Sequence, residues 1–135
     1  TITNHMGGPK MEDLKYTKTH EWVRVEGGEA VIGITDHAQA ELGDVVFVEL
    51  PAVGKVCRKE TPCGNIESVK AVSDVYSPLS GTIVGVNDQL SATPELVNKS
   101  PLTDGWLFRI KLDDPAELAS LMTQAQYEEY IQGLA

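Results

Sequence analysis

Between Val45 and Val86, short runs of β-branched and aromatic residues alternate with proline, glycine and serine. Runs of this kind are typical of β-strands, and the residues between them are typical of turns. Strands this short are not stable alone, so they must close into a sheet or pack as two sheets. The segment therefore predicts a mainly β domain, either a closed barrel or a sandwich of two sheets. The runs are "VVFVEL", "KVC", "NIESV", "AVSDVY" and "TIVGV".

The segment before Val45 predicts a β-hairpin followed by one short helix. Glu21–Val25 and Glu29–Ile34 are rich in β-branched and aromatic residues, and the loop between them contains two glycines, which can supply positive φ. Thr35 or Asp36 can then cap the first amides of a helix. Gly43 suits the left-handed conformation that ends many helices.

After Val86 the sequence predicts a closing strand and several short helices. Thr93 and Pro94 suit the N-cap and the first position of a single helical turn. The alternation in "GWLFRIKL" predicts a strand with one buried face. Two starts that resemble capping boxes predict one or two C-terminal helices: Asp114 with Pro115 and Glu117, and Thr123 with Gln126. The second helix would carry Tyr127, Tyr130, Ile131 and Leu134 along one face.

Length and charge restrict the classes of protein to consider. A chain of 135 residues suits one domain. We expect Thr1–Lys10, which are mostly small or polar, to be a disordered leader or cloning scar, and residues 11–135 to form the domain. The formal charge of −9 disfavours nucleic acid and anionic membranes as partners. No apolar run approaches the roughly 20 residues that span a bilayer, so a soluble protein is expected.

Conventional catalytic motifs are absent from the sequence, and we expect no enzyme. It contains no Gly-rich phosphate loop, no G-x-S-x-G and no H-E-x-x-H. His20 and His37 are lone histidines, which are more often structural than catalytic. Cys57 and Cys63 lack the spacing of a zinc site, and we expect two free thiols rather than a disulfide or a redox pair. A thiol nucleophile paired with a histidine stays open, although nothing marks either thiol as activated.

Lys70 stands between two extended runs, "ESV" and "AVSD", and can therefore occupy the tip of a tight β-turn. Its four-carbon stem would project into solvent there, within reach of another enzyme. From the residues alone, an ordinary surface lysine explains the position at least as well. Glu21, Glu67 and Asp74 could form an acid/base set, but solvated carboxylates on strand edges are the better interpretation of their spacing.

Several stretches resemble, in the same order, the characteristic segments of the glycine cleavage system H protein family. "ESVKA" with "SDVYSPLSG" resembles its lipoyl-attachment region, and the resemblance runs from about Leu14 to Tyr130. Biotin carriers have methionine on each side of the modified lysine, where this chain has Val69 and Ala71. Lipoyl domains of 2-oxo acid dehydrogenases usually have an acidic residue in place of Val69. The other stretches are "KYTKTHEWVRVE", "IGITDHAQAELGDVVFVELP" and "PELVNKSPLTDGW".

The resemblance implies a flattened β-sandwich of the biotinyl/lipoyl-carrier type, with short helices and a C-terminal helical segment. Lipoic acid is expected in amide linkage to Lys70, on a monomeric carrier that shuttles an aminomethyl group. The implied partners are a pyridoxal-phosphate-dependent glycine decarboxylase, a folate-dependent aminomethyltransferase, dihydrolipoyl dehydrogenase and lipoyl-attaching enzymes. The implied location is the cytoplasm of a bacterium, or the mitochondrial matrix of a eukaryote.

By the same resemblance, Thr19, Glu21 and Asp74 fall at positions that line a cleft for the loaded arm. Two carboxylates and a hydroxyl there would hold the ammonium of the cargo. Thr19 stands where the family often has serine, and Cys63 stands where a thiol is not part of the family pattern. His37 matches a recurrent family position, and we expect it to be a structural hydrogen-bonding residue.

Two other functions remain open at this point. A relay that donates lipoyl groups to 2-oxo acid dehydrogenases would keep the lipoyl group on Lys70 and change only the role. A plain interaction module with an unmodified lysine would also suit an acidic β domain. Lipoylation of Lys70 separates this last function from the other two.

Overall fold

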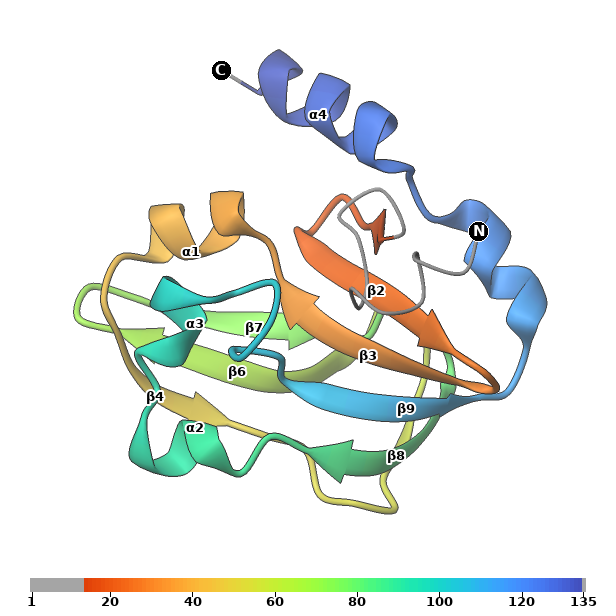
Figure 1. Cartoon of the computed structure of the whole chain (residues 1–135), viewed down its shortest axis with the longest axis horizontal. Coiled ribbons are helices and arrows are strands. Elements are labelled where there is room, and N and C mark those ends of the chain that lie inside the picture. Colours follow the sequence, from red (N-terminus) through yellow and green to blue (C-terminus); the bar gives the residue numbers. More distant parts are fainter. Residues whose placement is uncertain (1–13, 135) are drawn as a thin grey trace, which may run out of the picture.

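Short strands dominate the fold, which a computed structural model describes for residues 14–134. The strands are β1 (Lys15–Tyr16), β2 (Glu21–Glu26), β3 (Glu29–Ile34), β4 (Val45–Glu49), β5 (Val56–Cys57), β6 (Pro62–Ser68), β7 (Val72–Tyr76), β8 (Gly81–Val86) and β9 (Phe108–Leu112). They form a six-stranded antiparallel sheet in the order β1-β2-β3-β9-β8-β5 and a three-stranded sheet in the order β4-β6-β7. The two sheets pack as a sandwich (Figure 1), which confirms the mainly β fold. The expected leader, Thr1–Lys10, lies outside the described residues.

The helices are short and lie around the sandwich. They are α1 (Asp36–Leu42), α2 (Gln89–Ala92), α3 (Leu96–Lys99), the 3₁₀ helix η3 (Pro115–Ser120) and α4 (Gln124–Gly133). The hydroxyl of Thr35 caps α1 by accepting the N–H of Ala38, and Gly43 with φ of 81° follows its end. The α4 capping box of Thr123 and Gln126 is present as expected. Figure 1 shows α4 outside the sandwich, on the side of α1 and β2.

One expected helix start is wrong, and another is in place without its expected capping box. The helix expected at Thr93 and Pro94 begins at Leu96, because Thr93 instead ends α2, a helix that the sequence did not indicate. Asp114 caps η3, but Glu117 does not complete a capping box. Its carboxylate instead accepts hydrogen bonds from the N–H and the hydroxyl of Ser80.

One apolar core fills the space between the two sheets. Val23, Ile32 and Phe108 from the six-stranded sheet and Ile66 and Val75 from the three-stranded sheet belong to one buried cluster. Full burial of one such side chain contributes about 1.5–3 kcal/mol to folding. This cluster holds the two sheets together and fixes which face of each strand points outward.

A smaller cluster lies under the C-terminal helix and contains Trp22. The indole Nε1–H of Trp22 donates to the carbonyl oxygen of Pro101 at 2.9 Å. Its ring lies against Gly33, the cross-strand partner, where a Cβ atom would come within 2.5 Å of the ring. A side chain at position 33 is therefore excluded unless the indole moves.

Cys57 and Cys63 form a disulfide, with Cα atoms 6.5 Å apart. The expectation of two free thiols is therefore wrong. Cys57 ends β5 in the six-stranded sheet, whereas Cys63 lies in β6 of the three-stranded sheet. Sheet packing, and not the short spacing in sequence, brings the two sulfur atoms together. Both residues are buried, so the bond links the sheets from inside the core.

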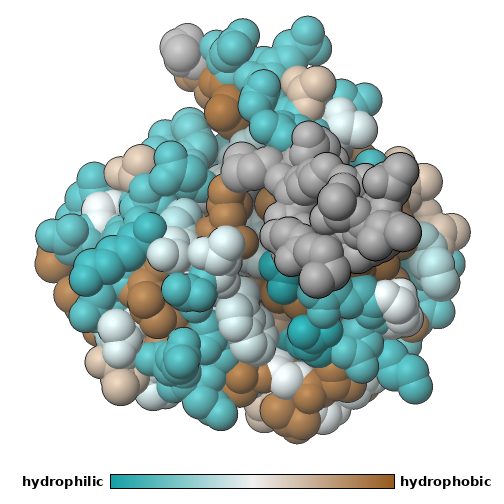
Figure 2. Space-filling view, viewed as in Figure 1, coloured by the Kyte–Doolittle hydropathy of each residue, from teal (hydrophilic) through white to brown (hydrophobic). Residues whose placement is uncertain are grey.

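The surface is mainly hydrophilic on the face shown in Figure 2, with separate hydrophobic areas between the polar ones. Within residues 14–134, no helix combines the length and the apolar character needed to cross a membrane.

Candidate functional site

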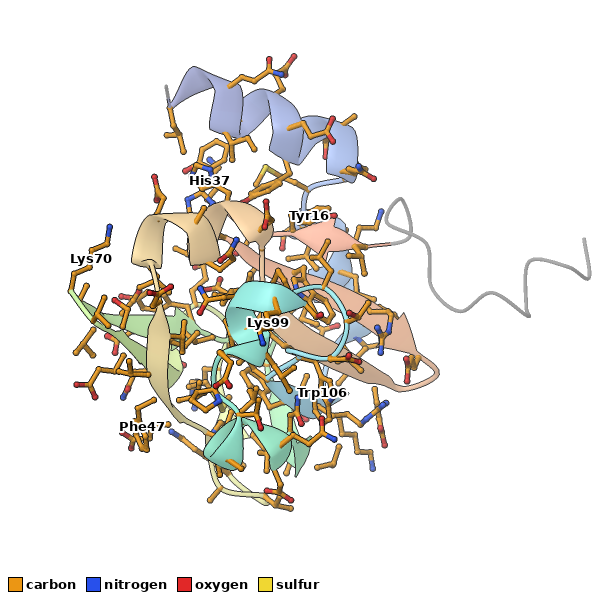
Figure 3. All side chains as sticks on the ribbon, turned by 60° about the vertical axis from the view of Figure 1, so that its left-hand side comes forward. Tyr16, His37, Phe47, Lys70, Lys99 and Trp106 are labelled. Atoms are coloured by element: carbon orange, nitrogen blue, oxygen red, sulfur yellow. A yellow bond between two sulfur atoms is a disulfide. The ribbon has the colours of Figure 1, made fainter. Side chains whose placement is uncertain are left out.

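Lys70 lies at the tip of the hairpin formed by β6 and β7, and it is exposed. Ser68 organises the turn: its N–H donates to the carbonyl of Ala71 at 2.8 Å, and its hydroxyl oxygen accepts the N–H groups of Lys70 and Ala71. The N–H of Val69 donates to the carbonyl of Asp44 at 3.0 Å, which fixes the tip to the main body. Figure 3 shows Lys70 projecting outward at the edge of the molecule.

The stem of Lys70 lies beside the end of α1. A Cβ atom added to Gly43 would be 3.5 Å from Cε of Lys70, an ordinary van der Waals contact. Glycine is favoured at position 43 by its φ of 81°.

A cavity of about 310 Å³, here called the hairpin cleft, begins next to Lys70. Its lining comes mainly from β7, α1 and the segment that joins β1 to β2, and it combines apolar side chains with the carboxyl groups of Glu21, Glu41 and Asp74. The lining residues are Thr19, His20, Glu21, Ile34, Ala38, Glu41, Leu42, Ile66, Ala71, Val72, Ser73, Asp74 and Val75.

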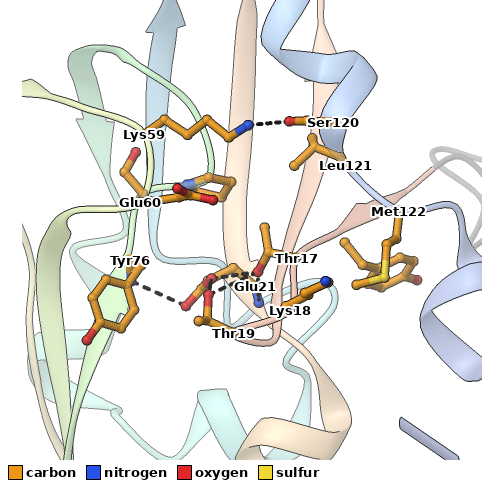
Figure 4. A pocket seen from close by; sticks show the side chains of 13 residues that line it. Thr17, Lys18, Thr19, Glu21, Lys59, Glu60, Tyr76, Ser120, Leu121 and Met122 are labelled. Carbon is orange, nitrogen blue, oxygen red and sulfur yellow. Dashed lines mark hydrogen bonds between the residues drawn. The ribbon is translucent and has the colours of Figure 1, made fainter. Parts of the chain in front are cut away.

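Glu21 is a buried carboxyl group, with only 2% of its surface exposed. Its Oε1 accepts hydrogen bonds from the hydroxyls of Thr17 at 2.7 Å and Thr19 at 2.5 Å. Its Oε2 accepts the N–H of Tyr76 at 3.2 Å. Figure 4 shows Glu21 between Tyr76 on one side and the two threonines on the other. Three donors from two segments thus fix the orientation of the carboxyl group.

Burial raises the pKa of Glu21 to about 7, because removal from water disfavours the ionised carboxylate. The hydrogen bonds from Thr19, Thr17 and the backbone of Tyr76 lower the pKa, but they only partly offset burial. Glu21 therefore changes its protonation near neutral pH, whereas an ordinary glutamate is fully ionised there.

Thr19 and Glu21 also line a second pocket of about 430 Å³ (Figure 4). Lys59 and Ser120 lie on its wall, and the Nζ of Lys59 donates to the Oγ of Ser120. Glu21 is therefore bordered by two cavities, and only the hairpin cleft includes residues next to Lys70.

The structure brings Thr19, Glu21 and Asp74 to one cavity, since all three line the hairpin cleft. Asp74 is exposed, and by register it pairs with Asn65, whose amide donates to the carboxylate of Glu49. Glu67, the third member of the acid/base set considered above, does not line either of these cavities and is exposed in β6.

Thr17 and Ser68 are polar site residues that the sequence did not single out. Thr17 reaches Glu21 because the chain turns between them: Glu21 N–H donates to the Thr17 hydroxyl at 3.0 Å, and His20 adopts a φ of 72°. A positive φ at a residue other than glycine is uncommon and gives no clear signal in a single sequence. The role of Ser68 could have been predicted from its position directly before the Val69–Lys70–Ala71 tip, since serine side chains often form hydrogen bonds with the backbone of turns.

His20 connects this loop to the C-terminal helix. Its Nδ1 lies 2.8 Å from the hydroxyl of Tyr127, which is also 2.7 Å from the hydroxyl of Thr35. Burial, followed by the nearby His37, lowers the pKa of His20, so the neutral imidazole is favoured. Tyr127 in turn stacks on Tyr16 of β1, with ring centroids 4.7 Å apart.

His37 does not fulfil the expected hydrogen-bonding role. Its Nε2 is buried and has no hydrogen-bond partner within the described part of the chain, and it lies 3.5 Å from the carboxylate of Glu41. The ring packs against His20, with centroids 4.6 Å apart. The helical spacing of four residues places His37 beside Glu41. Among residues 14–134, no group of three or more His, Cys, Asp or Glu side chains is arranged to hold a metal ion.

The two-sheet sandwich, with Lys70 at the tip of a hairpin, has the fold of the biotinyl/lipoyl-carrier type. The sequence model of the glycine cleavage H-protein family matches residues 14–133. The chain belongs to this family.

Relatives from bacteria and plants agree with this assignment. A glycine cleavage system H protein from Aeromonas salmonicida is 57% identical over 120 residues, which are 88% of this chain and 93% of the relative. A mitochondrial glycine cleavage system H protein from Flaveria trinervia is 56% identical over 120 residues, covering 89% of this chain and 73% of the relative. The crystal structure of a glycine cleavage system H protein from Mycobacterium marinum superimposes with a TM-score of 0.83 at 35% identity, over 90% of this chain and 98% of the other.

Proposed function

We propose that this chain is the lipoyl-bearing aminomethyl carrier of the glycine cleavage system, with lipoic acid in amide linkage to Lys70. Membership in a family of lipoyl carriers supports the role. The observation that best supports Lys70 as the attachment residue is its exposed position at a hairpin tip. This tip lies directly beside a cleft that reaches Glu21. In this role the chain is a substrate shared by several enzymes and is not itself an enzyme.

The hairpin cleft suits a lipoyl group chemically. The aliphatic part of such an arm matches the apolar walls, and an ammonium on its cargo matches the carboxyl groups of Glu21 and Asp74. When bound to Lys70, the lipoyl group would supply a disulfide able to take up the aminomethyl group and two electrons. The apolar wall residues are Ile34, Ala38, Leu42, Ile66 and Val75.

The side chains of the chain itself would bind and orient this group. Lys70 supplies the amide nitrogen, and Ser68 holds the turn that presents it. Thr17 and Thr19 orient Glu21, whose ionised form attracts an ammonium. A nearby positive charge would lower the pKa of Glu21 from about 7 and so favour that ionised form. The walls of the cleft would keep bulk water from a cargo that hydrolyses readily.

The proposed partners are a pyridoxal-phosphate-dependent glycine decarboxylase, a folate-dependent aminomethyltransferase, dihydrolipoyl dehydrogenase and the lipoyl-attaching enzymes. The family name supports partners within the glycine cleavage system. A formal charge of −9 suits brief docking with larger proteins by electrostatic steering. We propose a monomer that works in the cytoplasm of a bacterial source or in the mitochondrial matrix of a eukaryotic one.

Intact mass tests the attachment point. After incubation with a lipoyl ligase, lipoate and ATP, we expect the protein to gain the mass of one lipoyl amide. Lys70→Arg, which keeps the charge, should gain nothing. An unchanged mass of the unmutated protein would refute the proposal. A mass gain that persists in Lys70→Arg would show that another lysine is lipoylated.

The relay role shares the chemistry at Lys70, so a second assay separates it from the carrier role. The lipoylated protein, mixed with purified decarboxylase and aminomethyltransferase, should support glycine-dependent release of carbon dioxide and ammonia. Lipoylated protein that supports no release in this mixture would favour the relay.

A further inference from the structure

Large apolar side chains are exposed around Lys70, on the outer face of the three-stranded sheet. Val46, Phe47, Val69 and Val72, here called the hairpin patch, have exposed fractions of 49%, 52%, 70% and 67%. Val69 directly precedes Lys70 in the turn, and Val72 begins β7 two residues after Lys70. Phe47 and Val72 are both paired by register with Glu67 of β6, so they lie on the same outer row on either side of it.

A β-bulge explains why two consecutive residues of β4 are exposed. The register of β4 against β6 shifts between Val45 and Phe47, and Val46 is left without a partner. A regular strand would bury every second residue, but here Val46 and Phe47 both point away from the core. Figure 3 shows Phe47 and Lys70 on the same side of the molecule. Exposed apolar groups gathered in this way are typical of interaction surfaces.

The charges around the hairpin patch favour a partner with basic groups. Glu67 is exposed between Phe47 and Val72, and Asp44, Glu49 and Asp74 are exposed in the same segments. In the segments 44–49 and 65–74, Lys70 is the sole basic residue. A complementary surface would therefore offer an apolar depression surrounded by arginine or lysine.

The position of the patch distinguishes among the partners of the proposed carrier. Before modification, the Nζ of Lys70 extends only about 6 Å from the backbone, given bonds of roughly 1.5 Å. An enzyme that acylates Nζ must therefore contact the surface immediately around the turn. Enzymes that use the finished arm meet its reactive end several bonds further away, and they need not cover this surface.

We propose that the hairpin patch is the docking surface of the lipoyl-attaching enzyme, which covers it with an apolar face bordered by basic groups. The inference rests on the proposed function. In the reaction, the Nζ–acyl bond forms as the acyl–phosphate bond of a lipoyl adenylate breaks. AMP leaves, and the proton of Nζ passes to solvent.

Steady-state kinetics of lipoylation test this docking surface with a purified lipoyl ligase, lipoate and ATP. Phe47→Ser and Val72→Ser should raise the KM for the unmodified protein about tenfold, with little change in kcat, since a central apolar contact is commonly worth more than about 1 kcal/mol. Phe47→Lys should raise KM further, because it sets a positive charge against a basic partner. Val56→Ser is the matched control: Val56 is 66% exposed and lies in β5 of the other sheet, and its KM should change less than about twofold.

The outcomes separate this inference from the proposed function. If the unmutated protein gains no lipoyl group, the proposed function fails, and the docking surface fails with it. If it is lipoylated and Phe47→Ser reacts equally fast, the docking surface alone is wrong. Normal lipoylation combined with slower reoxidation by dihydrolipoyl dehydrogenase would assign the patch to that enzyme and overturn the inference. A dimer in sedimentation that Phe47→Ser dissociates would assign it to a second copy, with the same consequence.

Discussion

Glu21 combines burial, three hydrogen-bond donors and a position between two cavities. Its pKa of about 7 follows from burial, which the donated hydrogen bonds only partly offset. A carboxyl group of this kind is neutral in acid and ionised in mild base, so both the stability of the fold and the proposed binding of a cation depend on pH at this residue.

The stability of the protein should fall as pH rises from 4.5, the ordinary pKa of a glutamate, to about 7, the folded pKa of Glu21. The folded pKa is about 7 and the ordinary value is 4.5, so between them only the folded state keeps the proton. The resulting stabilisation is fully present below pH 4.5 and is lost as pH rises through 7. Across that range the loss is about 3 kcal/mol of unfolding free energy.

Urea unfolding of the protein and of Glu21→Gln at several pH values measures this contribution. The difference between their unfolding free energies should change by that amount between acid and mild base. His20 has the opposite effect, because its lowered pKa destabilises the folded state in acid. Both proteins contain His20, so its contribution cancels in the difference between them. Parallel curves for the two proteins would show that the pKa of Glu21 is not raised.

Loss of both cleft carboxylates should shorten the lifetime of the aminomethyl-loaded, lipoylated protein. Glu21→Gln with Asp74→Asn keeps the side-chain volumes and removes the negative charges. We expect at least about tenfold faster release of ammonia, since about 1.4 kcal/mol of lost binding changes the bound population tenfold. Glu67→Gln is the control, because Glu67 is an exposed carboxylate outside the cleft. An unchanged half-life in the double variant would exclude a role of these carboxylates in holding the cargo.

Two elements position the site by different means. The β6–β7 hairpin is a local structure, and its turn is held mainly by Ser68, within the same segment. The loop that carries Thr19 and leads into Glu21 of β2 is held by local bonds of Thr17 and also by a distant element, because His20 is bonded to Tyr127 of α4. Local spacing therefore predicts the first element, while the second also depends on the packing of the C-terminal helix.

Removal of the Tyr127 hydroxyl should destabilise the protein while the ring stacking is kept. Tyr127→Phe leaves His20 Nδ1 and the Thr35 hydroxyl without this partner, which should cost about 1–3 kcal/mol. Tyr130→Phe is the matched control, since its hydroxyl donates to an exposed carbonyl at Lys18, and it should cost less than about 1 kcal/mol. Urea unfolding followed by tryptophan fluorescence measures both. Equal losses in the two variants would mean that the contact with His20 has no special importance.

At the scale of the molecule, two sheets enclose one core and leave the lysine hairpin at an edge (Figure 1). The Cys57–Cys63 disulfide joins these sheets within the core. The patterns of β-branched residues predicted most of the strands, and Thr35, Gly43 and Thr123 correctly marked helix ends. Short helices such as α2 escaped prediction because a few residues without a strong cap or period carry little signal.

The sequence by itself determined the β-rich architecture, the exposed turn at Lys70 and, through its characteristic segments, the family. The alternation of apolar and polar residues and the positions of turn residues are local patterns, so they can be recognised in the sequence without knowledge of the fold. Only the tertiary structure decided the disulfide, the bonds of Thr17 and Tyr76 to Glu21 and the pKa near 7. These properties arise from residues brought together by the packing of separate segments and from the exclusion of water, neither of which is encoded in local spacing.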